Sequence, residues 1–158
     1  MRVAEAVAMY FGHEPDYIAE CEILPGVYLG SANDAVYWDG ATICVHEDEG
    51  ALAQGGHWIP ILSRTGEDIH PYDPSAYEAS RLALDAATSY IRHFQQLHIP
   101  VLVHCWAGIE RSPLTMAWFL KRYGYTKTLN EAYDKIREAR PIIEDRLHWL
   151  PQKSGAGA

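Results

Sequence analysis

The sequence predicts an α/β fold, a central and mostly parallel sheet flanked by helices, and two observations support this. Short runs of β-forming apolar residues alternate along the chain with longer segments whose apolar residues recur at helical spacing. The run "IPVLVH" over 99–104 is almost entirely apolar, as in a strand buried on both faces of a parallel sheet. A chain of 158 residues, 48% apolar and 22% charged, is long enough to bury the core of one such domain.

The first half of the chain supplies most of the predicted strands. "ILPGVYLG" over 23–30 gives a strand pair around a Pro-Gly turn, and "ATICV" over 41–45 and "HWIPIL" over 57–62 give two more. Between the last two, the acidic "HEDEG" over 46–50 is expected to be a solvated turn. The segment "SRTGEDIHPYDP" over 63–74 is long for a connection inside a compact domain, which makes it a candidate functional loop.

Capping signals predict where three helices begin. Ser75 and Glu78 form a capping box that opens the first of them. Pro113, at a first helical position, opens the second, and Thr128 with Glu131 opens the third. We expect a helical N-terminal extension over 1–21, the domain itself over 22–152 and a disordered tail over 153–158.

Charge and cysteine content narrow the function classes. A net charge of −8 argues against nucleic acid or a membrane surface as a partner. The three cysteines (Cys21, Cys44 and Cys105) form no paired framework and no metal-ligand cluster. We therefore expect reduced thiols, a cytoplasmic location and neither a metal nor another cofactor.

The segment from Cys105 to Arg111 joins the buried strand to a helix N-terminus. There the unpaired amides and the helix dipole favour an anion, and Gly108 lets the backbone curl. The guanidinium of Arg111 can hold two phosphate oxygens at once. The same field lowers the pKa of a cysteine from about 8.5 to roughly 3.5–7.5. We infer that Cys105 is largely a thiolate at neutral pH and can act as a nucleophile.

These residues, "HCWAGIERSP" over 104–113, resemble the HCxxGxxRS signature of the cysteine-dependent protein tyrosine phosphatases, in the dual-specificity branch. "ILPGVYLGSANDA" and "LNEAYDKIREARPII" resemble further parts of that branch, so the likeness covers roughly residues 22–150. The resemblance implies a protein tyrosine phosphatase-like fold. It also implies hydrolysis of phosphate monoesters in two steps.

Carried over by position, the resemblance implies a role for each loop residue. Cys105 forms a phosphocysteine, Ser112 stabilises the departing thiolate, and His104 orients the loop without touching the substrate. The side chain of Arg111 and a series of backbone amides hold the phosphate oxygens. These amides belong to Trp106, Ala107, Gly108, Ile109, Glu110 and Arg111.

The family also supplies an aspartate that protonates the leaving group, and two candidates lie in the 63–74 loop. Asp73, 32 residues before Cys105, resembles the usual family spacing and is placed first. Asp68, 37 residues before, is closer to the preceding strand, where the family normally has this residue, and is the alternative. Each can also be an ordinary loop residue.

Three side chains near the loop keep two interpretations each. Glu110 departs from the family pattern. In the first interpretation its side chain points to solvent or pairs with Arg64 or another basic residue; in the second it disfavours highly anionic substrates. Trp106 either forms a wall of the pocket or packs beneath the loop. Cys44 is a small core residue, or it forms a protective disulfide with Cys105.

Phosphotyrosine in a protein or peptide is the first substrate expected, with phosphoserine and phosphothreonine as extensions. The alternatives are a phosphatase of phosphoinositides or RNA 5′-phosphates, and a catalytically weak phosphate-binding module. Sulfur transfer, by analogy with rhodanese-like anion loops, is a third, but the Arg111-Ser112 ending fits phosphatases better.

Overall fold

The computed structural model describes residues 18–64 and 77–151. Most of the predicted N-terminal extension and all of the predicted tail over 153–158 lie outside these residues. So do both acid candidates, Asp68 and Asp73.

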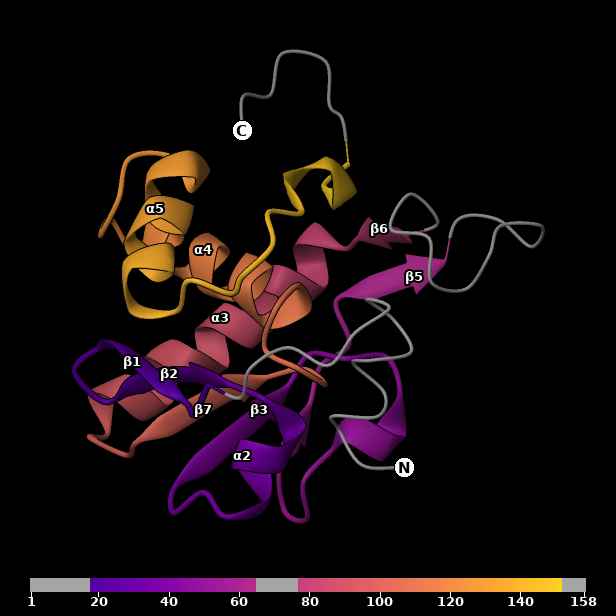
Figure 1. Ribbon diagram of the computed structural model, residues 1–158, viewed down its shortest axis with the longest axis vertical. Coiled ribbons are helices and arrows are strands. Elements are labelled where there is room, and N and C mark those ends of the chain that lie inside the picture. The colour runs from indigo at the N-terminus through magenta and orange to yellow at the C-terminus, as the bar shows by residue number, and fades with distance from the viewer. Residues whose placement is uncertain (1–17, 65–76, 152–158) are drawn as a thin grey trace.

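A five-stranded sheet forms the centre of the molecule (Figure 1). The first strand in this order runs antiparallel to the second, and every other neighbouring pair is parallel, so the predicted mostly parallel sheet is confirmed. From one edge to the other the strands are β1 (Cys21–Leu24), β2 (Val27–Gly30), β7 (Val101–His104), β3 (Ala41–Cys44) and β4 (His57–Trp58).

Strand β7 lies in the middle of the sheet and every one of its residues is buried. Its last residue, His104, is in register with Gly30 of β2 on one side and with Cys44 of β3 on the other. The carboxyl ends of three parallel strands therefore meet at one edge of the sheet, where ligands of open α/β sheets bind. Cys105 is the next residue after this edge.

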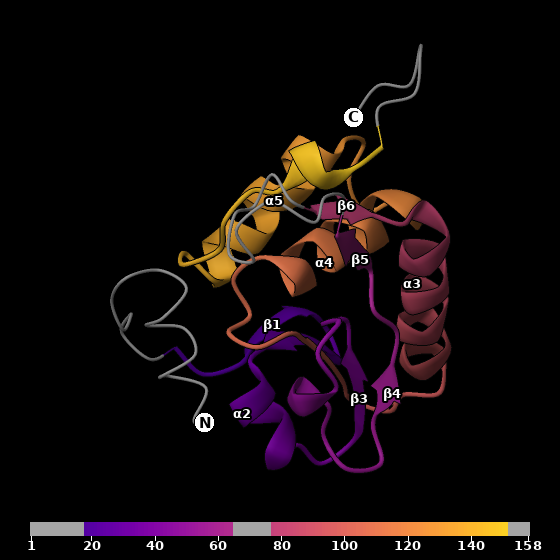
Figure 2. The ribbon, with the colours of Figure 1, turned by 90° about the vertical axis from the view of Figure 1, so that its right-hand side faces the viewer.

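Three long helices lie on one face of the sheet and a short one on the other (Figures 1 and 2). The long helices are α3 (Arg81–Gln96), α4 (Arg111–Arg122) and α5 (Leu129–Ala139), and the short one is α2 (Ala32–Val36). Two 3₁₀ turns, η1 (Glu49–Ala51) and η3 (Leu147–Trp149), complete the described elements together with a small antiparallel pair, β5 (Leu62–Arg64) and β6 (Tyr77–Ala79).

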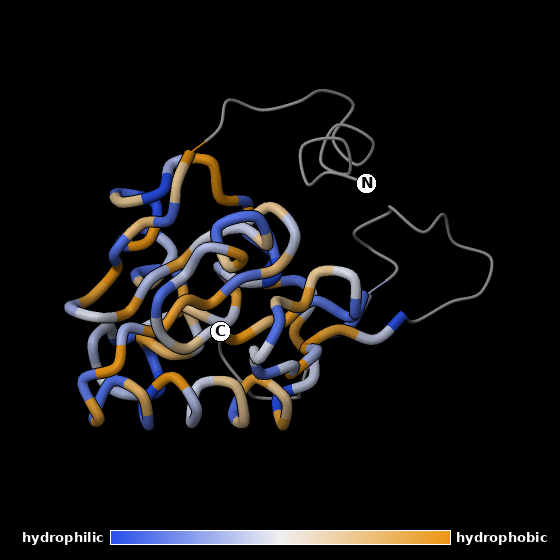
Figure 3. Tube along the Cα trace, turned by 90° about the horizontal axis from the view of Figure 1, so that it is seen from below, coloured by the Kyte–Doolittle hydropathy of each residue, from blue (hydrophilic) through white to orange (hydrophobic). Residues whose placement is uncertain are grey.

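Helix α4 packs against β7, α3 and α5, and nine of its residues are buried. Along the trace, hydrophobic and hydrophilic residues alternate at short intervals, as expected for helices and strands with one buried face (Figure 3). Within the described segments no helix has the length and apolar character needed to span a membrane.

The predicted start of the first long helix is wrong. Tyr77–Ala79, placed by the Ser75 capping box inside the helix, instead forms β6 and pairs with β5. The N-cap of α3 is Ser80, whose hydroxyl accepts a hydrogen bond from the Ala83 amide at 3.1 Å. Strand pairing outweighs the local capping signal.

The segment 57–62, predicted as one strand, is divided between two sheets. His57–Trp58 is the edge strand β4, whereas Leu62 begins β5. Pro60 lies between them and has no N–H to donate to a ladder, so continuous pairing through this point is disfavoured.

Candidate active site

The residues between β7 and α4 form a tight loop that begins at Cys105, whose exposed fraction is only 3%. Gly108 has a φ of 70°, and a Cβ there would lie 2.5 Å from the carbonyl oxygen of Gly30. Both the backbone conformation and the close approach to β2 therefore require glycine. The N-cap residue of α4, Glu110, makes no side-chain hydrogen bond to the first turn, so the side chain at this position does not occupy the helix amides.

Two neighbours hold Cys105 in place. Its Sγ lies 3.2 Å from the hydroxyl of Ser112, which is fully buried in the first turn of α4. The Nδ1 of His104 lies 3.1 Å from the Cys105 carbonyl oxygen, and because a carbonyl can only accept, this nitrogen carries the proton. Burial lowers the pKa of His104, so its ring is neutral.

The guanidinium of Arg111 is held by a residue that the sequence analysis assigned to a solvated turn. Glu47, just after β3, accepts hydrogen bonds from Nε and Nη2 of Arg111, both at 2.7 Å. Burial by itself would raise the pKa of Glu47, but the hydrogen bonds and charge of Arg111 outweigh it, and the pKa is lowered. The pair is therefore ionised, and Glu47 fixes one edge of the guanidinium while Nη1 is not part of this pair.

Glu47 is the main site residue that the sequence analysis missed. One signal could have found it: β3 and β7 are parallel neighbours, so residues after β3 meet residues after β7 at the same sheet edge. The expectation of a solvated turn is thus wrong for Glu47. It is also wrong for His46, which is 9% exposed.

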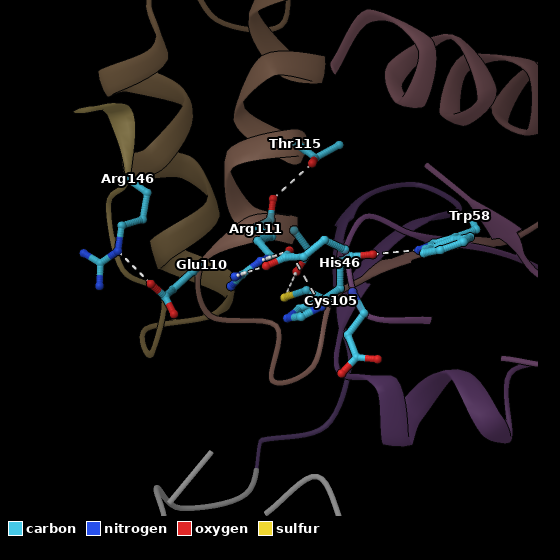
Figure 4. Close-up of polar contacts among 10 residues, drawn as sticks. His46, Trp58, Cys105, Glu110, Arg111, Thr115 and Arg146 are labelled. Carbon is cyan, nitrogen blue, oxygen red and sulfur yellow. Dashed lines mark hydrogen bonds and ion pairs between the residues drawn. The ribbon is translucent and has the colours of Figure 1, made fainter. Parts of the chain in front are cut away.

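Aromatic rings cover the other side of Arg111. The rings of Tyr77 in β6 and Trp149 in η3 lie 5.2 and 5.6 Å from the guanidinium carbon, measured to the ring centroids. Trp149 is 1% exposed, so this contact is shielded from water. With Arg111 itself only 6% exposed, its charge lies in a low-dielectric setting next to the Cys105 sulfur (Figure 4).

Glu110 is buried, at 4% exposed, so the solvent-facing interpretation of this residue is wrong. It accepts a 2.7 Å hydrogen bond from Nε of Arg146, which is the basic partner that the alternative anticipated without naming (Figure 4). The negative charge beside the loop is thereby compensated before any substrate arrives.

The side chains of His46, Trp106 and Cys44 lie beside the start of the loop, with His46 next to the Arg111–Glu47 pair. The ring of Trp106 makes an edge contact with His46 at 5.8 Å and packs with the apolar residues around Cys44, so it is only partly exposed. Burial, with a smaller contribution from the charge of Arg111, lowers the pKa of His46 to about 4. Cys44 is a fully buried free thiol whose pKa is raised by burial to about 12, in agreement with the core interpretation.

Of the predicted site residues, the structure thus brings Cys105, Arg111 and Ser112 together with the backbone of 106–110. Both acid candidates belong to the predicted loop over 63–74, and they lie in the segment 65–76, outside the described residues. Asp73, with Asp68 as alternative, stays a prediction.

Comparisons with known proteins identify relatives of this chain. The family model described as "Dual specificity phosphatase, catalytic domain" matches residues 58–153. Human dual specificity protein phosphatase 5 is 31% identical over 142 residues, which cover 83% of this chain and 34% of that protein. Tyrosine-protein phosphatase vhp-1 of Caenorhabditis elegans is 26% identical over 147 residues, covering 82% and 20%. The chain therefore spans between about a fifth and a third of the length of these relatives.

Solved structures with the same fold include human DUSP28, with a TM-score of 0.61, 20% identity and coverage of 85% of this chain and 90% of that one. A structure of PTPMT1 in complex with PI(5)P has a TM-score of 0.62 at 19% identity, covering 84% and 92%. At these identities the likeness is one of fold, and it confirms the predicted protein tyrosine phosphatase-like architecture.

Proposed function

The chain belongs to the dual specificity phosphatase catalytic-domain family, and from this premise we propose that it hydrolyses phosphate monoesters through a phosphocysteine at Cys105. One observation carries the proposal: the Cys105 sulfur, the Ser112 hydroxyl 3.2 Å away and the guanidinium of Arg111 lie together at the start of α4. The combination supplies a nucleophile, a hydrogen-bond donor for it and a cation for the phosphate.

In the first step the Cys105 thiolate attacks phosphorus, an S–P bond forms and the bond to the leaving oxygen breaks. Arg111 and the amides of residues 106–111 hold the three other oxygens, where negative charge accumulates. The leaving oxygen takes a proton from Asp73, with Asp68 as the alternative. In the second step water attacks phosphorus and gives its proton to the same carboxylate. The sulfur leaves as a thiolate stabilised by Ser112.

A phosphoprotein is the proposed substrate, with phosphotyrosine preferred. The curated relatives are named as protein phosphatases, and their names include both tyrosine and dual specificity. Because the side chain of Cys105 is only 3% exposed, a phosphate must enter well below the surface to reach it. A phenyl ring is a longer and more rigid spacer than the single methylene of phosphoserine, so phosphotyrosine fits such a depth better.

The experiment compares the wild-type chain with Cys105→Ser on para-nitrophenyl phosphate, under reducing conditions and with vanadate as inhibitor. We expect turnover by the wild type, inhibition by vanadate and no turnover by the variant. Activity that survives in Cys105→Ser would exclude the nucleophile. An inactive wild type that still binds vanadate would favour the phosphate-binding module.

Substrate class is tested with matched phosphotyrosine and phosphoserine peptides, a soluble phosphoinositide and an RNA 5′-phosphate. We expect the phosphotyrosine peptide to give the highest kcat/KM. The loop over 105–111 contains no lysine, and its buried Glu110 already occupies Arg146, so it offers little for additional phosphates. A higher kcat/KM for the phosphoinositide or the RNA would replace phosphoprotein as the substrate.

The general acid is tested by the pH dependence of kcat for an aryl phosphate. Asp73→Asn is expected to remove the alkaline limb of the profile, whereas Asp68→Asn keeps it. The reverse result would make Asp68 the general acid. An unchanged profile in both variants would exclude both aspartates as the general acid.

A further inference from the structure

Arg140, the C-cap residue of α5, contacts the backbone of the 105–111 loop. Its exposed fraction is 1%. Its Nε donates to the carbonyl of Gly108 at 2.9 Å and its Nη2 to the carbonyl of Ala107 at 3.1 Å. Its Nη1 donates in the opposite direction, to the carbonyl of Ala19 at 2.8 Å, just before β1. One buried side chain thus joins three distant parts of the chain at the back of the loop.

These bonds fix the direction of two peptide groups. In a trans peptide the C=O and the following N–H point in opposite directions, and the described chain contains no cis peptide. When Arg140 holds the carbonyls of Ala107 and Gly108 outward, the amides of Gly108 and Ile109 point to the inside of the loop. Both amides belong to the set that the proposed function assigns to the phosphate oxygens.

Charge makes Arg140 different from the two other arginines at the loop. Arg111 is paired with Glu47 and Arg146 with Glu110. Within the described part of the chain, the contacts of Arg140 are backbone carbonyls and the sulfur of Cys21, so no carboxylate neutralises it. A buried cation without an acidic partner is unfavourable unless other groups compensate for it. Here its positive field falls on the loop and polarises the peptide groups it binds, which makes their N–H groups stronger donors.

We propose that Arg140 is a positioning residue for phosphoryl transfer, which acts by aiming and polarising the amides of Gly108 and Ile109 without touching the substrate. This proposal rests on the proposed function of the loop. A purely structural role would instead connect α5 to β1 and leave anion binding unchanged in any variant that folds.

The test measures tungstate binding by calorimetry in a Cys105→Ser background, so that it does not depend on turnover. Arg140→Met removes the hydrogen bonds and the charge with little change in length. The matched control is Arg122→Met. Arg122 lies at the end of α4 that is farther from the loop, and it also donates a hydrogen bond to a backbone carbonyl, that of Asp85. Thermal unfolding of each variant reports its stability separately.

We expect tungstate to bind at least about tenfold more weakly after Arg140→Met, because the amides of Gly108 and Ile109 are then neither held in position nor polarised. Binding in the Arg122→Met control should stay within about twofold of the parent, even if its unfolding temperature falls further. Equal tungstate affinity in Arg140→Met and the parent would overturn the proposal. A loss of affinity that follows the unfolding temperature in both variants would also overturn it.

Arg140→Lys is the second variant, and it tests the positioning role of Arg140 if Arg140→Met does not fold. Lysine keeps the charge but has no planar fork, so it cannot hold both loop carbonyls in the same geometry. We expect intermediate tungstate affinity and, in the active enzyme, an acid limb of kcat/KM that moves to higher pH because the thiolate is less well stabilised. Wild-type affinity together with an unmoved acid limb in Arg140→Lys would contradict the proposal. The failure of the proposed function is a separate result, namely a wild type without turnover whose tungstate affinity still depends on Arg140.

Discussion

The two sides of the 105–111 loop hold their arginines in opposite ways. On the substrate side Arg111 faces a carboxylate, that of Glu47, and aromatic rings. On the rear side Arg140 faces the backbone carbonyls of Ala107 and Gly108. Both side chains are almost fully buried, at 6% and 1% exposed.

The two arrangements keep one loop ready for an anion in different ways. A cation that must meet a charged substrate is oriented by an acid, which keeps the net charge of the empty site low. A cation that only shapes the backbone can be bound by neutral dipoles, and its uncompensated field then supports the amides. The following predictions concern the charged groups around Arg111 and the loop, in order of the expected free-energy change.

Replacing Arg111 by lysine tests the substrate side most strongly. Lysine lacks the planar fork that holds two oxygens at once, so we expect kcat/KM for an aryl phosphate to fall by roughly a thousandfold. Arg137 in α5 has a side chain that is 42% exposed and pairs with Asp134, and its change to lysine is the control that should keep wild-type activity. Arg111→Lys with more than a tenth of wild-type kcat/KM would mean that bidentate binding is not essential.

The pH dependence of stability reports the burial of His46 beside Arg111. Because the pKa of His46 is lowered from 6.5 to about 4 on folding, the unfolded chain binds more protons between these pH values. The free energy of unfolding is therefore highest above pH 6.5. It decreases as the pH falls towards 4, by about 3 kcal/mol in total from His46 alone.

Urea unfolding at pH 7 and pH 4.5 measures this contribution. We expect wild type to lose roughly 2 kcal/mol more than His46→Gln between the two pH values. The control is His93→Gln, at an exposed position. It should lose as much unfolding free energy between pH 7 and pH 4.5 as the wild type does. If His46→Gln shows the same acid destabilisation as wild type, His46 is not a neutral buried group in solution.

Glu47→Gln weakens the orientation of Arg111 while it retains the shape of the side chain. We expect kcat/KM to fall about tenfold, mainly in kcat, because a misoriented guanidinium stabilises the transition state less. The neighbouring Glu49→Gln, at an exposed position in η1, is the matched control. A rise in kcat/KM for Glu47→Gln would instead identify Glu47 as a competitor of the substrate for Arg111.

Arg146→Gln removes the guanidinium that donates a 2.7 Å hydrogen bond to the buried carboxylate of Glu110, next to the loop. Because the negative charge of Glu110 is then less well compensated, we expect KM for a phosphate ester to rise by roughly fivefold with little change in kcat. The double variant Glu110→Gln, Arg146→Gln should restore KM. Failure of this restoration would show that Arg146 acts by packing on Trp149, 5.7 Å from its guanidinium, and not by charge.

The sequence was informative where the signals are contiguous. The apolar run into His104, the glycine at 108 and the proline at 113 lie within a few residues of one another, and they specify the strand, the loop and the helix without reference to distant parts of the chain. Cys105, Arg111 and Ser112 could therefore be brought together from sequence and family resemblance alone.

Partners supplied by distant segments could not be predicted in the same way. Glu47 precedes Arg111 by 64 positions, and Arg140 belongs to the end of a different helix. "HEDEG" has the composition of a solvated turn, and only the pairing of β3 with β7 places it against the loop. The start of α3 was misplaced for a related reason, because the pairing of β6 with β5 is a tertiary effect that a capping box does not reveal.

The phosphocysteine at Cys105 can be detected by rapid-quench mass spectrometry of the enzyme during turnover of an aryl phosphate. The Ser112→Ala variant should slow the second step, because the sulfur then leaves without its hydrogen bond, and the intermediate should accumulate. We expect one phosphoryl group on the peptide that contains Cys105, absent from Cys105→Ser. Sustained turnover with an unmodified Cys105 peptide, or with the phosphoryl group on another residue, would contradict it.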